Sequence, residues 1–145
     1  MRRAVALVLL VGAARAGAQV RPEARLEFAN TGAGNRVAAG LGLTTKLGPY
    51  LRGSALVAHD VWRDGGGTPL ASVESHVRFL LDPLAEQSWG LSFAAGLGFR
   101  ERPYLLVAAD LEGPRMRSVR PAIQLALGGG LRLGCVLRRA ATGRR

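Results

Sequence analysis

The chain has 145 residues, 48% of them hydrophobic, and this length allows a single domain. Its formal net charge of +10 is high enough for a nucleic-acid-binding protein, but much of the excess lies near the two ends, so we expect no nucleic-acid partner. Cys135 is the only cysteine, which excludes an internal disulfide and a cysteine-based metal site, and we expect no cofactor.

Residues 1–18 have the pattern of a secretory signal peptide. Arg2 and Arg3 are followed by an apolar run over residues 4–13, which is too short to span a bilayer as a helix. Ala16-Gly17-Ala18 fits the small residues that a signal peptidase requires, so we expect cleavage before Gln19. The sequence therefore predicts an exported protein.

Eight stretches of alternating apolar and polar residues follow, and each predicts a β-strand because successive side chains of a strand point to opposite faces. Turn-forming residues such as Gly48-Pro49 and Gly65-Gly66-Gly67 separate the stretches. Evenly spaced strands of this kind predict an all-β sandwich or barrel. The stretches cover residues 21–30, 35–46, 50–62, 70–82, 89–100, 104–112 and 117–128, and the last begins at residue 131.

The clearest alternation is in residues 89–100. Its odd positions, from Trp89 to Phe99, are apolar, whereas its even positions are glycine, alanine, serine or arginine. A helix is excluded because the apolar period is two and each glycine would cost about 1 kcal/mol in a helix. The length matches the roughly 9–11 residues of a tilted membrane-spanning strand.

Two closed architectures agree with this pattern, and they assign the two faces oppositely. A secreted soluble barrel or sandwich turns its apolar face inward and can bind an apolar ligand there. An outer-membrane barrel turns its apolar face to lipid. Glycine and alanine on the polar face, and aromatic residues at the ends of stretches, favour the membrane barrel. The expected interfacial aromatics are Tyr50, Trp62, Trp89, Phe99 and Tyr104.

The polar face carries nearly equal numbers of acidic and basic side chains. Paired charges are tolerable in a narrow interior, and eight strands leave an interior that side chains can fill. We therefore expect a filled, non-conducting barrel with a structural or binding role. The expected interior network is Glu23, Arg25, Glu27, Arg36, Arg52, Asp60, Glu74, His76, Arg78, Asp110, Glu112, Arg120 and Arg132.

With this alternation, these aromatics and this signal, residues 21–139 resemble the small eight-stranded outer-membrane barrels of the OmpA transmembrane type. The resemblance implies an eight-stranded antiparallel up-and-down transmembrane β-barrel with short loops. It implies a bacterial outer-membrane location, contact with outer-membrane lipid, and assembly by the barrel insertion machinery as a monomer. We expect residues 19–139 to form the barrel and residues 140–145 a basic tail.

A third hypothesis is a barrel-embedded lipid-modifying hydrolase. Ser72, Glu74 and His76 share one strand face, and a Ser–His–acid set can support nucleophilic catalysis. However, residues two positions apart share a face in any strand. We therefore expect His76 to be an interior hydrogen-bonded side chain, and we expect no enzymatic activity. His59 and His76 lie on opposite faces, so no metal site is expected.

Overall fold

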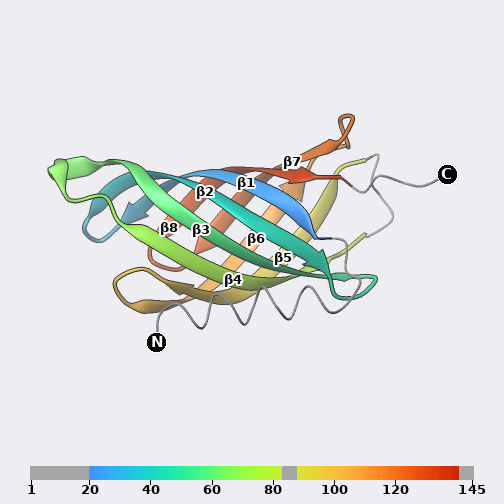
Figure 1. Ribbon diagram of the computed structural model, residues 1–145, viewed down its shortest axis with the longest axis horizontal. Coiled ribbons are helices and arrows are strands. Elements are labelled where there is room, and N and C mark those ends of the chain that lie inside the picture. The colour runs from blue at the N-terminus through green and yellow to red at the C-terminus, as the bar shows by residue number, and fades with distance from the viewer. Residues whose placement is uncertain (1–19, 83–87, 141–145) are drawn as a thin grey trace.

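The computed structural model describes residues 20–82 and 88–140, and these form a closed antiparallel barrel (Figure 1). Consecutive strands pair in sequence order, and β1 also pairs with β8, which closes the sheet. The predicted eight-stranded antiparallel fold is thus confirmed. The strands are β1 (Arg21–Thr31), β2 (Gly34–Lys46), β3 (Leu51–Arg63), β4 (Ala71–Leu80), β5 (Gly90–Phe99), β6 (Pro103–Glu112), β7 (Val119–Leu127) and β8 (Leu131–Arg139).

The strand limits lie within two residues of those expected from the alternation. The larger differences have local causes. The seventh stretch was expected to begin at Arg117, but the φ of Arg117 is 55°, in the left-handed region, so this residue belongs to a turn and β7 begins at Val119. A 3-10 turn, η1 (Asp64–Gly66), connects β3 to the segment before β4. Residues 1–18 and 141–145, the expected signal peptide and most of the expected tail, lie outside the described residues.

The barrel has two distinct ends, which Figure 1 shows at opposite sides of the view. The terminal mouth is the end where β1 begins at Arg21 and β8 ends at Arg139. The hairpin mouth is the opposite end, and it carries the connections β1–β2, β3–β4, β5–β6 and β7–β8. The β1–β2 connection consists only of Gly32 and Ala33, and the β7–β8 connection spans residues 128–130.

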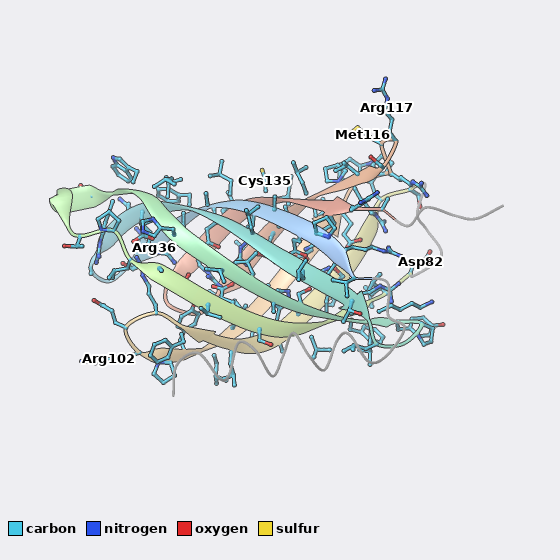
Figure 2. All side chains as sticks on the ribbon, viewed as in Figure 1. Arg36, Asp82, Arg102, Met116, Arg117 and Cys135 are labelled. Atoms are coloured by element: carbon cyan, nitrogen blue, oxygen red, sulfur yellow. The ribbon has the colours of Figure 1, made fainter. Side chains whose placement is uncertain are left out.

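The outer surface of the barrel wall is apolar. Side chains at alternate positions of every strand point outward, and Leu41, Leu97 and Leu105 have 73%, 61% and 74% of their surface exposed. Figure 2 shows Cys135 of β8 among these outward side chains. No helix in the described part of the chain is long and apolar enough to cross a membrane.

The inner face combines small residues with charged ones. Ala94, Leu106, Ala108 and Ala126 form a small buried cluster there. Gly96 permits close packing at the β4–β5 pair, since a Cβ at this position would lie 2.1 Å from the carbonyl oxygen of Ser75. These small residues leave the interior volume to long polar side chains, which are described next.

Candidate functional site

Two rings of alternating acidic and basic side chains cross the interior. The first, the central ring, consists of Arg25, Glu27, Glu74 and Arg132. Arg25 contacts Glu27 at 3.3 Å and also pairs with Glu74, while Arg132 contacts Glu27 at 3.4 Å and also pairs with Glu74. Each charge in this ring therefore has two opposite neighbours, and at most 4% of any of these side chains is exposed.

The second ring, the terminal ring, lies toward the terminal mouth and consists of Glu23, Arg78, Asp110 and Arg138. Glu23 contacts Arg78 at 3.2 Å and Arg138 at 3.1 Å. Asp110 contacts the same two guanidinium groups at 3.1 and 2.6 Å. The four residues come from β1, β4, β6 and β8, so no two of them are close in sequence. Alternating charges at these distances offset much of the cost of removing each charge from water.

Gln124 joins the two rings. Its side-chain oxygen accepts a 3.0 Å hydrogen bond from Arg25, and its amide nitrogen donates a 2.8 Å hydrogen bond to Asp110. Gln124 was not among the expected network residues, although it lies on the polar face of its strand between Ile123 and Leu125. The alternation of β7 therefore carried the signal that could have identified it.

The network continues to the hairpin mouth. Arg36, which Figure 2 labels within the barrel, contacts Glu27 and Asp60 at 3.3 Å each. Asp60 also pairs with Arg100, which follows β5 and was not among the expected network residues. Partial burial, and then repulsion from Arg36, lower the pKa of the Arg100 guanidinium.

The network also reaches the terminal mouth, where Glu112 accepts from Ser92 at 3.1 Å and contacts Arg120 at 3.1 Å. Arg138 lies within the expected barrel residues 19–139 but was not among the expected network residues. It points to the inner face of β8, because the alternation continues to the end of that strand, and it contacts Glu112 at 3.3 Å. Arg52 lies at the same mouth and donates to the carbonyl oxygens of Gly48 and Leu51, at 2.8 and 3.0 Å.

Tyr104 points into the barrel, so the expectation that it is one of the interfacial aromatics is wrong. Its hydroxyl donates a 2.7 Å hydrogen bond to Glu74, and the Arg132 guanidinium lies 5.7 Å from the centre of its ring. The side chain points inward because Tyr104 has the same position in the alternation as Asp110 and Glu112 of β6. The aromatic residue type, taken without its place in the alternation, led to the wrong assignment.

The other four expected aromatics are exposed, two toward each mouth. Tyr50 and Trp89 precede β3 and β5 at the terminal mouth, with 47% and 63% of their surface exposed. Trp62 and Phe99 lie at the hairpin ends of the same strands, with 51% and 46% exposed. Val61 and Trp62 are neighbours in sequence, yet both side chains point outward. The cause is a shift of one residue in the β2–β3 register between Val37 and Ala38, which interrupts the alternation of β3.

The arrangement around His76 differs from that of a catalytic triad. His76 is 3% exposed, and its Nε2 lies 3.4 Å from a nitrogen of Arg78, which can donate to it. The Glu74 carboxylate is occupied by Arg25, Arg132 and Tyr104. Among the described residues, no group of three or more histidine, cysteine, aspartate or glutamate side chains could hold a metal ion.

Comparison with known proteins finds a similar fold but identifies no family. No protein-family model matches the chain, and no curated protein matches it in sequence. A solved structure that resembles it is the solution NMR structure of the de novo designed protein TMB2.3, an eight-stranded transmembrane barrel. The match has a TM-score of 0.62 at 13% sequence identity and covers 89% of this chain and 99% of the designed one. The chain is therefore similar in fold to a designed transmembrane barrel.

Proposed function

We propose that this protein is an outer-membrane β-barrel with a structural or binding role, whose interior is closed by the ion-pair network and does not conduct. It would contact outer-membrane lipid, insert through the barrel assembly machinery and act as a monomer. The proposal includes no catalytic step and no cofactor.

The observation that carries the proposal is the inverted distribution of polarity. Glu74, Asp110 and Arg132 are at most 1% exposed, while a continuous set of leucine, valine and phenylalanine side chains covers the outside. A soluble barrel with this exterior would present an apolar surface far larger than the few hundred Å² typical of monomers. A lipid environment accepts such a surface, and exposed aromatics toward both mouths suit its two interfaces.

The same distribution argues against the soluble alternative, because a barrel that carries an apolar ligand needs an apolar interior. Here the centre of the barrel is occupied by the central and terminal rings. It also supports a closed interior, because the rings extend across the barrel from β1 to β4, β6 and β8.

Cell fractionation combined with detergent gels tests the location. We expect the protein in the outer-membrane fraction, and we expect unheated and boiled samples to migrate differently because a folded barrel resists the detergent. A protein found in the soluble periplasmic fraction, with equal migration of both samples, would overturn the proposal.

Labelling of Cys135 tests whether the strands span lipid. Cys135 lies at the middle of β8 and is exposed on the outer wall, so lipid should shield it from a polar, membrane-impermeant maleimide. We expect no labelling in vesicles and full labelling after unfolding. The matched control is Cys135→Ser combined with Arg102→Cys, because Arg102 is exposed in the β5–β6 connection (Figure 2). Equal labelling of both proteins in vesicles would contradict a lipid-facing Cys135.

A further inference from the structure

The terminal mouth contains a cavity of about 70 Å³ with a strongly basic lining. Seven arginines and one lysine contribute to the lining, against one carboxylate, that of Glu112. Arg21 and Lys46 reach it from β1 and β2, Arg115 from the β6–β7 connection, and Arg139 from β8. We propose that this cavity is a binding site for a phosphate-bearing anion.

The charge imbalance at this mouth persists when its surroundings are included. Glu23 and Asp110 of the terminal ring and Asp82, which Figure 2 labels at this end, raise the number of described carboxylates to four. The cationic side chains then number nine, the eight of the lining and Arg117 of the β6–β7 connection. The hairpin mouth is close to balance. It has Arg36, Arg63, Arg100 and Arg102 against Asp60, Asp64 and Glu101. The excess is therefore a property of one mouth, and a multiply charged anion would reduce the repulsion there.

The donors suit the oxygen atoms of a phosphate group. Guanidinium groups bind phosphate through pairs of parallel hydrogen bonds, and seven of the eight cationic side chains are arginines. Arg52 is held at the cavity by its bonds to the Gly48 and Leu51 carbonyl oxygens, so its position is fixed in advance. The hydroxyl of Thr45, which also lines the cavity, is buried and has no hydrogen-bond partner among residues 20–82 and 88–140.

The size of the cavity limits the ligand to a small group. One buried water needs a cavity volume of roughly 10–15 Å³, and this cavity has about 70 Å³. It can therefore hold several non-hydrogen atoms, about as many as one phosphate contains. The phosphate can belong to a lipid headgroup or to a small soluble compound. The lipid source rests on the proposed function, because only a membrane-spanning barrel brings this mouth to a lipid surface.

Isothermal titration of the folded protein with inorganic phosphate tests the site. The protein is kept in a maltoside detergent that carries no phosphate, and sodium chloride at equal ionic strength serves as the blank. We expect saturable binding with a Kd below about 1 mM. We also expect at least a tenfold weaker affinity in Arg115→Gln/Arg139→Gln. Its control is Arg63→Gln/Arg102→Gln, which removes the same charge at the hairpin mouth and should bind as the unmodified protein does.

A second titration separates the two sources. Short-chain phosphatidic acid is compared with the matching diacylglycerol, which lacks the phosphate. Binding of phosphatidic acid that inorganic phosphate displaces supports a lipid headgroup, while binding of inorganic phosphate alone supports a soluble ligand. No saturable binding of either, or equal weakening by both double variants, would overturn the site. Because the titrations use detergent, their failure leaves the membrane proposal intact, and failed insertion leaves the phosphate result intact.

Discussion

The hydroxyl of Tyr104 on β6 donates a 2.7 Å hydrogen bond to the carboxylate of Glu74 on β4, although β5 lies between the two strands. Gly98 of β5 pairs in register with both residues, so the three form one row across the sheet. A Cβ at Gly98 would lie 2.1 Å from a carbon of the Tyr104 ring. The absence of a side chain at Gly98 therefore allows Tyr104 to cross β5 and reach the central ring.

Gly98→Ala should destabilise the barrel by about 1–3 kcal/mol, because the added methyl group overlaps the Tyr104 ring and displaces it. Urea unfolding from lipid vesicles measures the change. Gly32→Ala is the matched control, since a Cβ there has no neighbour within 4 Å. Similar losses of unfolding free energy for the two variants would show that the crossing of Tyr104 over Gly98 does not contribute to stability.

Glu74→Ala should cost about 3–5 kcal/mol of unfolding free energy, because it leaves Arg25 and Arg132 buried with one acidic partner fewer. Glu74→Gln keeps the shape and one acceptor oxygen, so a smaller loss is expected. The same urea titration measures both variants. A loss below about 1 kcal/mol for Glu74→Ala is typical of an exposed pair and would contradict a desolvated central ring.

Ile123→Arg should cost about 2–4 kcal/mol in vesicles, because Ile123 faces outward at the middle of β7 and pairs with Cys135 at the middle of β8. Leu131→Arg, at the first residue of β8, should cost only about 0–1 kcal/mol near the interface. Unfolding of both variants gives the comparison. Equal costs would be incompatible with a lipid midplane at Ile123.

Planar-bilayer recordings should show no stable conductance steps of porin size. The central and terminal rings fill the section of an eight-stranded barrel, and the cavity described at the terminal mouth holds only about 70 Å³. A gel shift on heating would verify folding in each preparation. Reproducible large steps from the folded protein would contradict the closed interior.

The strands and their two faces could be predicted because a period of two is a local property of the sequence. Residues such as Leu97 and Glu74 needed only their neighbours for a correct assignment of face. Tyr104 was misplaced because its aromatic character was given more weight than its position in the alternation. Arg138 was left out of the expected network, although its alternation with Leu137 places it on the inner face of its strand.

The pairing inside the barrel could not be predicted. The contacts of Arg78 with Glu23 and Asp110 join β4 to β1 and β6, and they depend on the stagger between strands, which alternation does not encode. The same holds for Arg100 and Asp60, which are 40 residues apart. The sequence indicated that acidic and basic side chains would balance, but not which pairs would form.

The rings also determine how the barrel can close. Sliding β8 by two residues along β1 would keep every side chain on its own face, and an outer wall of leucine and valine would hardly distinguish the two alignments. In the observed register Glu23 lies opposite Arg138 at this seam. A two-residue slip in one direction would instead bring Arg25 opposite Arg138 and set two buried guanidinium groups against each other. The interior charges thus select the correct alignment of β8 on β1, which the apolar exterior does not distinguish.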